Sequence, residues 1–158
     1  MAEVINAGNV QIEVPLDKLL MEVMKMRDRG LRFDQACAAY VNEKFELSYS
    51  FSDDDAYRFE NIRVVIDLDE EVPSVSNIYP AAVFYENEMR ELFGVRIEMI
   101  SFDLHDKLYR LGKDVVYPML PEAGKKKMAE EMAADKEKAE KEEAETASSD
   151  AKENGGEQ

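Results

Sequence analysis

Hydrophobic positions follow two different periods along the first hundred residues of the chain. Apolar side chains at the spacing of one helix face predict an amphipathic helix from about Leu16 to Arg29, with Gly30 as its left-handed cap. Strict alternation at Phe45–Phe51 and again at Ile62–Leu68 predicts the two strands of an antiparallel hairpin. Such alternation leaves one sheet face apolar, so we expect the helix to cover that face.

Three further elements complete the pattern. A short apolar run predicts a strand at Gln35–Val41, whereas Pro, Ser and Asn residues at 70–79 are typical of a loop. Pro80 is tolerated in a first helical turn and Gly94 suits a helix end, which predicts a second helix between them. A final strand is expected at Val95–Ile100. Together these elements predict an α+β fold, with an N-terminal helix packed on an antiparallel sheet, a second helix, a final strand and an extended C-terminal arm.

The periodicity ends beyond Ser101. Residues 102–121 hold too many large apolar side chains for a solvated loop, so this segment either completes the core or lies along a partner. From Gly124 onward Lys, Glu and Ala dominate, a composition that cannot bury enough surface to fold alone. We therefore expect a folded domain at residues 1–100, a partner-binding arm at 101–121 and a charged, disordered or transiently helical tail at 122–158.

Charge and cysteine content restrict the function. A formal net charge of −15 disfavours binding to nucleic acid or to an anionic membrane surface, and favours a protein partner. The single cysteine, Cys37, excludes an internal disulfide framework and a cluster held by four thiolates of this chain; we expect it to be a small core residue. The apolar runs are far shorter than the roughly 20 residues of a membrane-spanning helix, and no leader segment is evident, so the chain is expected in the cytosol.

The second predicted helix carries a distinctive motif. Residues 78–94 read Ile-Tyr-Pro-Ala-Ala-Val-Phe-Tyr-Glu-Asn-Glu-Met-Arg-Glu-Leu-Phe-Gly. This segment resembles the signature of the 30-kDa-type subunit family of NADH:quinone oxidoreductase, respiratory Complex I. That family typically reads Trp-Pro-Ala-Ala-Asn-Trp-Tyr-Glu-Arg-Glu, two more residues and then Asp-Leu-Phe-Gly. The similarity extends back through Val72–Ile78 and, more loosely, through Leu16–Asp69.

The chain departs from the family pattern after the motif. The family's His-Pro-Asp-Leu-Arg-Arg stretch is replaced at 101–106 by Ser-Phe-Asp-Leu-His-Asp, which lacks the arginine pair. In this respect, and in its short C-terminal region, the chain is more similar to the counterpart of this subunit in the energy-converting (Ech-type) membrane-bound NiFe hydrogenases.

The resemblance implies a non-catalytic scaffold subunit of a membrane-bound, ion-translocating oxidoreductase complex. Such a subunit would hold no cofactor itself, and iron–sulfur clusters and, in a hydrogenase, a NiFe centre would lie in partner subunits. It would dock on the large catalytic subunit and the small iron–sulfur subunit, contact the membrane subunits only indirectly, and lie peripherally on the cytoplasmic side of the cell membrane. The alternative is a free-standing acidic adaptor or assembly chaperone for such a complex.

The predicted docking surface combines the signature helix with the arm. Its candidate residues are Tyr79, Pro80, Phe84, Tyr85, Glu86, Glu88, Glu91, Leu92, Phe93, Gly94, Leu104, His105, Tyr109 and Tyr117. The three glutamates are expected on a solvated or partner-facing helix surface, where they would meet cations of the large subunit. Glu86 and Arg90 have the spacing of an i, i+4 ion pair.

Two other kinds of chemistry compete with this surface. Glu86 and Glu88 could act as a paired acid and base in a small hydrolase, although no pocket is evident around them. His105, flanked by Asp103 and Asp106, could in principle hold a metal, but no second nitrogen or sulfur ligand is near in the sequence. An exposed or interface histidine is the better interpretation.

Overall fold

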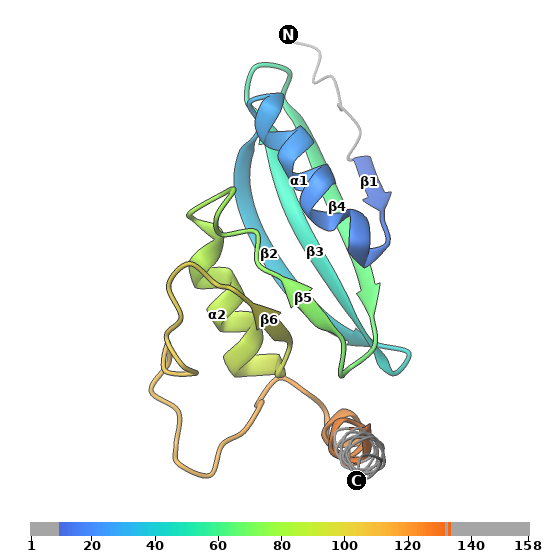
Figure 1. Ribbon diagram of the computed structural model, residues 1–158, viewed down its shortest axis with the longest axis vertical. Coiled ribbons are helices and arrows are strands. Elements are labelled where there is room, and N and C mark those ends of the chain that lie inside the picture. Colours follow the sequence, from blue (N-terminus) through green and yellow to red (C-terminus); the bar gives the residue numbers. More distant parts are fainter. Residues whose placement is uncertain (1–9, 132, 134–158) are drawn as a thin grey trace, which may run out of the picture.

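The computed structural model describes residues 10–131 and 133 and has two layers, with helices packed on one face of a β-sheet (Figure 1). The elements follow in the order β1 (Val10–Glu13), the 3-10 turn η1 (Leu16–Lys18), α1 (Leu19–Asp28), β2 (Arg32–Val41), β3 (Lys44–Asp53), β4 (Arg58–Ile66), β5 (Glu71–Pro73), α2 (Ala82–Phe93) and β6 (Arg96–Glu98). Residues 122–131 form a further helical segment. The α+β class predicted from the sequence is confirmed.

The main sheet has the strand order β1-β4-β3-β2. The predicted β3–β4 hairpin is confirmed, and β2 pairs with β3 through a tight turn at Asn42 and Glu43, both with positive φ. Because β1 pairs with β4 in parallel, the sheet is mixed and not purely antiparallel as expected. No element was predicted for β1, since four residues carry too little periodic signal.

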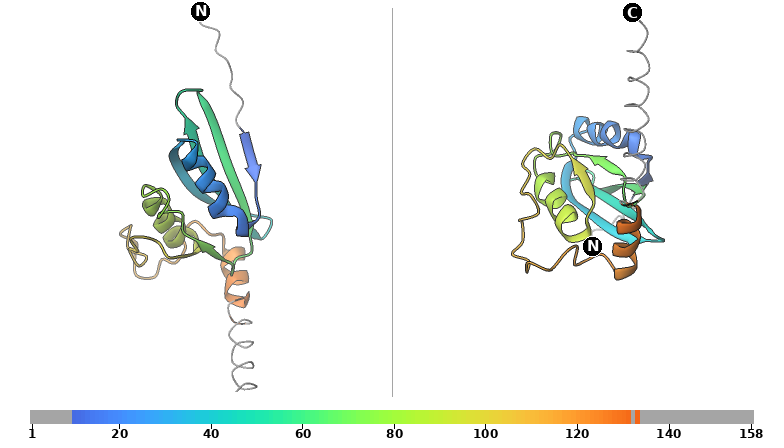
Figure 2. Two further views of the ribbon diagram at one scale, coloured as in Figure 1. Left: turned by 45° about the horizontal axis from the view of Figure 1, so that its top comes forward. Right: turned by 60° about the horizontal axis from the view of Figure 1, so that its bottom comes forward.

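The core lies on the helix-covered face of this sheet. Leu47 and Tyr49 of β3 and Ile62 of β4 are fully buried, and α1 places Leu19 and Val23 over them. Figure 2 shows α1 lying along that face. The opposite face is polar: Arg63 of β4, for example, pairs with Glu46 of β3 at 3.0 Å and donates to Ser48.

The prediction of Cys37 as a core residue is wrong. Along β2 the side chains of Ala36 and Ala38 are buried, whereas Cys37 between them is exposed on the opposite face. The two small alanines let α2 approach β2 closely.

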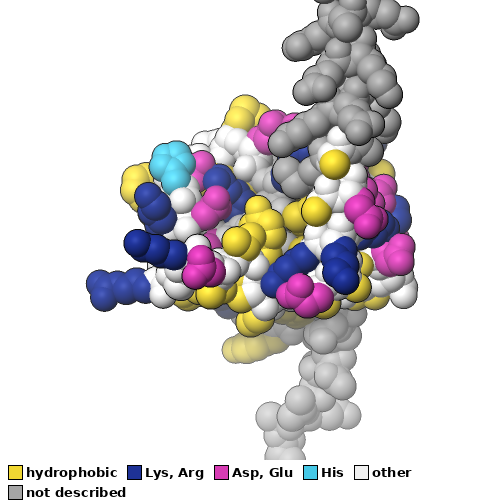
Figure 3. All heavy atoms as spheres, turned by 90° about the horizontal axis from the view of Figure 1, so that it is seen from below, with side chains coloured by type: hydrophobic (Ala, Val, Ile, Leu, Met, Phe, Trp, Pro, Cys, Tyr) yellow, Lys and Arg dark blue, Asp and Glu magenta, His cyan; other side chains and the backbone are white. Residues whose placement is uncertain are grey.

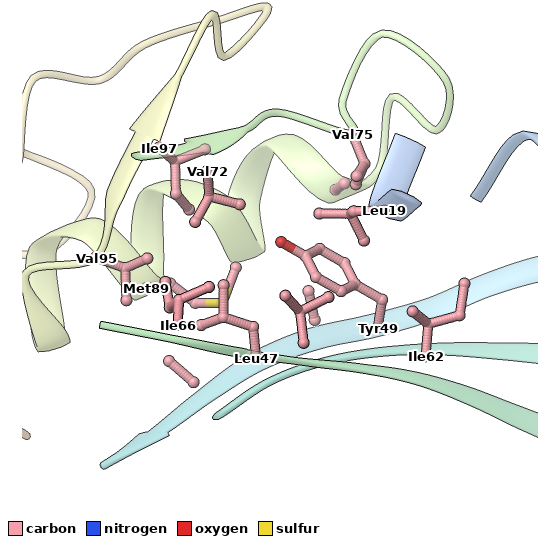
Figure 4. Close-up of a cluster of buried hydrophobic side chains, with 14 of the residues drawn as sticks. Leu19, Leu47, Tyr49, Ile62, Ile66, Val72, Val75, Met89, Val95 and Ile97 are labelled. Carbon is pink, nitrogen blue, oxygen red and sulfur yellow. The ribbon is translucent and has the colours of Figure 1, made fainter. Parts of the chain in front are cut away.

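A second, two-stranded sheet fixes α2 in place. β5 and β6 pair in parallel, so the expected loop at 70–79 contains a strand, and the predicted final strand joins this small sheet and not the main one. Val72 of β5, Ile97 of β6 and Met89 of α2 all point toward the same apolar cluster as Leu47 (Figure 4).

The chain returns to the sheet after the arm. In the helical segment 122–131, Met128 is buried in the core, and Lys127 pairs with Glu43 of the β2–β3 turn at 3.1 Å. The tail predicted at 122–158 to be disordered or transiently helical therefore begins with a helical segment that packs on the core. Residues 132 and 134–158 of this tail lie outside the described part of the chain. None of the helices among residues 10–131 and 133 is long and apolar enough to cross a membrane.

Candidate functional site

Helix α2 begins and ends close to the predicted positions. Tyr79 and Pro80 form the turn before it, and Gly94 ends it with φ of +83°, donating to the Arg90 carbonyl oxygen at 3.0 Å. A positive φ favours glycine because it has no Cβ. The Tyr117 ring also lies against Gly94, so closely that a Cβ there would come within 2.9 Å of two ring carbons.

Glu86 is fully buried and not solvated, so the prediction of a solvated or partner-facing position is wrong for this residue. Its carboxylate accepts hydrogen bonds from the Ser74 hydroxyl and the Val75 N–H, both at 2.6 Å. Burial raises the pKa of Glu86, although these hydrogen bonds act in the opposite direction. Glu86 therefore fastens the segment after β5 to α2.

The Tyr49 hydroxyl is also buried and has no hydrogen-bond partner among the described residues. Burial raises the pKa of Tyr49, and the charge of Glu86 raises it further.

Asn87 is the first of three α2 side chains that hold the arm, residues 101–121. It is buried, and its amide nitrogen donates to the Phe102 carbonyl oxygen at 3.0 Å. Its amide oxygen accepts from the Leu104 N–H at 2.8 Å. One side chain thus satisfies both a donor and an acceptor of the arm backbone.

Glu91 is the second, one helical turn further along. Its carboxylate is buried and accepts from the N–H groups of Leu108 at 2.7 Å and Tyr109 at 3.0 Å. The prediction of a solvated or partner-facing position is therefore wrong for Glu91 as well. Glu88 lies at the half-exposed edge and accepts from the Tyr109 hydroxyl at 2.5 Å.

Arg90 is the third. It pairs with Asp103 at 2.8 Å and with Asp106 at 3.1 Å, and not with Glu86 as the i, i+4 spacing suggested. The His105 N–H and the Arg90 guanidinium both donate to Asp103 and lower the pKa of its carboxyl group. The His105 side chain itself is exposed, as expected.

These bonds hold the arm in a conformation that its backbone would not adopt freely. Four non-glycine residues beside or within the arm have positive φ: Met99, His105, Asp106 and Tyr117. Each such residue costs about 1 kcal/mol or more, and persists only where surrounding contacts determine it. Further along, Met119 donates its N–H to the Leu92 carbonyl oxygen at 2.9 Å, and Leu120 is buried in the core.

The predicted docking residues divide into two groups. Those that pack or bond within the chain are Tyr79, Tyr85, Glu86, Glu91, Leu92, Phe93, Gly94, Leu104 and Tyr117; Tyr79, for example, stacks on Phe33 and donates to the Leu31 carbonyl oxygen. Those that reach the surface are Pro80, Phe84, Glu88, His105 and Tyr109, of which Glu88 and Tyr109 also bond to each other.

Several exposed residues of the arm were predicted only as part of the apolar segment 102–121 and not as docking residues. The exposed large apolar side chains of this region are Phe84, Phe102, Tyr109, Leu111, Val115, Val116 and Met119. Phe102 is 63% exposed, Val116 57% and Met119 59%. Viewed from below, hydrophobic side chains gather near the middle of this face, and charged side chains surround the histidine at one edge (Figure 3). The arm thus turns its polar backbone toward α2 and apolar side chains outward.

The comparison with protein families matches a segment that includes the main sheet, α2 and nearly all of the arm. A family model described as the respiratory-chain NADH dehydrogenase 30 Kd subunit matches residues 12–120, from within β1 to the end of the arm. The chain belongs to this family. The family assignment supports a role as a subunit of a multi-subunit respiratory complex. A search of curated proteins found no significant match.

A solved structure shares the fold of this member of the 30 Kd subunit family. It is a chain of the membrane-bound sulfane sulfur reductase (MBS), an archaeal respiratory membrane complex. The TM-score is 0.61 at 23% sequence identity, covering 76% of this chain and 72% of the other. At this identity the likeness establishes the fold alone.

The geometry of this family member gives no support to the hydrolase alternative. Glu86 is sealed from solvent, and neither of two surface cavities beside the arm, of about 290 and 430 Å³, is lined by it. Within residues 10–131 and 133, no group of three or more His, Cys, Asp or Glu side chains is placed to hold a metal ion.

Proposed function

We propose that the chain is a non-catalytic scaffold subunit of a membrane-bound, ion-translocating oxidoreductase complex. Its family membership supports the subunit role. The observation that carries the docking proposal is that polar side chains of α2 bind the arm while apolar side chains of the arm face outward. Asn87, Arg90 and Glu91 bind the chain's own arm and so present apolar side chains such as Phe102 and Val116 to the outside.

This arrangement suits a subunit that orders its neighbours. Contiguous exposed apolar side chains are uncommon on free monomers and mark interaction surfaces. A rigid arm loses little conformational entropy on binding, because its shape is already fixed by α2. In this role the chain keeps neighbouring redox centres at their spacing and carries no electrons itself.

The proposed partners are the large catalytic subunit and the small iron–sulfur subunit, with membrane subunits contacted only indirectly. The cofactors, iron–sulfur clusters and in the hydrogenase branch a NiFe centre, would lie in those partners and not in this chain. We place the subunit peripherally on the cytoplasmic side of the membrane.

Among the branches of such complexes we favour the energy-converting NiFe hydrogenases. The missing arginine pair at 101–106 supports this choice, since Asp103 and Asp106 there pair inward with Arg90. The fold is also present in a sulfane sulfur reductase. Metal-binding cysteines in the large subunit would distinguish these branches: four indicate a hydrogenase, and altered ones a quinone-reducing or sulfur-reducing relative.

Purification of the complex tests the proposal against the adaptor or assembly-chaperone alternative. The full chain, tagged at one terminus and expressed in its own host, is captured from detergent-solubilised membranes. A subunit is expected to bring down the large and small subunits in equimolar amounts through a second, size-exclusion step. Substoichiometric recovery, or capture only from cells still assembling the complex, would support the adaptor or chaperone.

A further inference from the structure

The arm carries cations that form no ion pair with the part of the chain that the structure describes. Lys107, Arg110 and Lys113 are exposed, and none of them pairs with a carboxylate of the described residues. Two of the neighbouring acids are already engaged, since Asp106 pairs with Arg90 and Glu91 binds arm N–H groups. In Figure 3, Lys and Arg side chains project from the edge that carries the histidine.

This local charge runs against the charge of the whole chain. The net charge is −15, yet the segment from Lys107 to Tyr117 holds three cations and a single acid, Asp114. A local group of cations on a chain of net negative charge contributes little to the stability of the fold. Its main effect is to attract and orient a charged partner.

Two of these cations, Lys107 and Lys113, line a groove that also has apolar walls. A cavity of about 430 Å³ is lined by the apolar residues Tyr109, Leu111, Val115 and Val116. Lys107 and Lys113 also lie in its wall, together with Asp106 and Glu91, which are already bound to Arg90 and to N–H groups of the arm. An apolar centre with a charged rim is the usual anatomy of a protein–protein contact.

We propose that this groove receives an acidic segment of a partner polypeptide, with an apolar side chain seated against Val115 and Val116 and carboxylates facing Lys107, Arg110 and Lys113. The inference rests on the proposed scaffold role and specifies the chemistry of the partner surface. Charge complementarity selects an acidic occupant. The chain's own acidic residues 134–158 contain no large apolar side chain to fill the groove. The overall charge of −15 opposes an anionic lipid surface.

Zero-length cross-linking of the assembled complex tests this directly. A carbodiimide joins lysine amines to carboxylates in contact, and mass spectrometry identifies the linked peptides. Lys107 and Lys113 are expected to link to Asp or Glu residues of another subunit. Lys25 and Lys44, which lie 2.6 and 2.8 Å from Glu22 and Asp67, are internal positive controls.

Charge reversal supplies a second readout. The variant K107E/R110E/K113E is expected to weaken retention of partner subunits by about tenfold or more, because three exposed ion pairs are lost and the reversed charges repel the partner's carboxylates. The matched variant R27E/R58E/K126E reverses three exposed cations outside the arm and is expected to retain partners like the wild type. Both variants should keep the wild-type unfolding temperature within about 2 °C, because surface substitutions cost little.

The possible outcomes separate the groove's occupant from the scaffold role. Links from Lys107 or Lys113 to residues 134–158 would overturn the proposal in favour of the chain's own tail. Sedimentation of the isolated chain with vesicles of 7:3 phosphatidylcholine and phosphatidylglycerol, lost in the arm variant, would overturn it in favour of lipid. Equimolar co-purification with no cross-link from the arm lysines would refute the acidic partner and leave the scaffold role standing. Failure to co-purify at all would refute the scaffold role itself.

Discussion

The ring of Tyr117 rests on Gly94, the residue that ends helix α2, and leaves no room for a side chain there. The same glycine has a left-handed backbone, so two independent constraints meet at one position. Through this contact the end of the signature helix determines where the far half of the arm crosses it.

Gly94→Ala is expected to destabilise the chain by about 2–4 kcal/mol, because the left-handed backbone and the displaced Tyr117 ring both contribute. Gly30→Ala is the matched control, since Gly30 has φ of +78° but nothing within 4 Å of the point where a Cβ would stand. It should cost only about 1–2 kcal/mol. Urea unfolding of both variants checks this, and equal losses would contradict the steric role of Tyr117.

Glu91→Gln is expected to loosen the arm, because a neutral amide oxygen accepts more weakly than a carboxylate from the N–H groups of Leu108 and Tyr109. The loss should be about 1–2 kcal/mol, which corresponds to at least about fivefold faster hydrogen exchange at those two amides. Glu88→Gln, at the half-exposed edge, should leave both amides protected. Unchanged exchange in Glu91→Gln would mean that α2 does not hold the arm.

Glu60 connects β4 to the end of α1 by accepting two hydrogen bonds from Arg29, at 2.5 and 2.8 Å. These bonds lower the pKa of Glu60 below its ordinary value of 4.5. The pair therefore stabilises the fold above about pH 4.5 and is lost as the pH falls through the lowered pKa. Glu60→Gln should be about 1–2 kcal/mol less stable at pH 7. Urea unfolding across pH should show this difference shrink toward acid; a constant difference would contradict the assignment.

Glu86 should have the opposite pH dependence. Burial raises its pKa above 4.5, so the folded state holds the proton more tightly than the unfolded state does. Stability is therefore lost as the pH rises from 4.5 through the raised pKa. In Glu86→Gln this loss is absent. The free energy of unfolding of the variant should therefore increase relative to that of the wild type as the pH rises. The measurement is urea unfolding of both proteins from pH 4.5 to 8. A constant difference in free energy of unfolding over this range would contradict a raised pKa of Glu86.

Elements with a strong local signal could be predicted from the sequence. Helices α1 and α2 have both an apolar period and a glycine at the end, and β3 and β4 alternate strictly. β1 and β5 have four and three residues, and their partners lie far along the chain. Pairing between short strands that are far apart in the sequence produces no local pattern of alternating apolar residues. The orientation of β2 was equally undetermined, because Cys37 and its alanine neighbours are all small and apolar.

The site was predicted in position but not in detail. Glu86 and Glu91 were assigned to the surface because buried carboxylates are rare without partners. Their partners are backbone N–H groups of distant segments, which the sequence does not reveal. One available signal was missed: Asn87, Glu91 and Gly94 follow the i, i+4, i+7 spacing of a single helix face. That stripe is the one covered by the arm.

The most direct test of the central claim is the affinity of the full chain for the rest of its complex when the outer arm surface is changed. Val116→Ser combined with Met119→Ser removes apolar contact without touching the α2–arm bonds; Met21→Ser combined with Met24→Ser on α1, with exposures of 46% and 53%, is the matched control. Reconstitution of a complex stripped of this subunit, followed by quantitative mass spectrometry, should show at least about tenfold weaker rebinding for the arm variant and wild-type rebinding for the control. Equal rebinding of both variants would contradict the docking role of the arm.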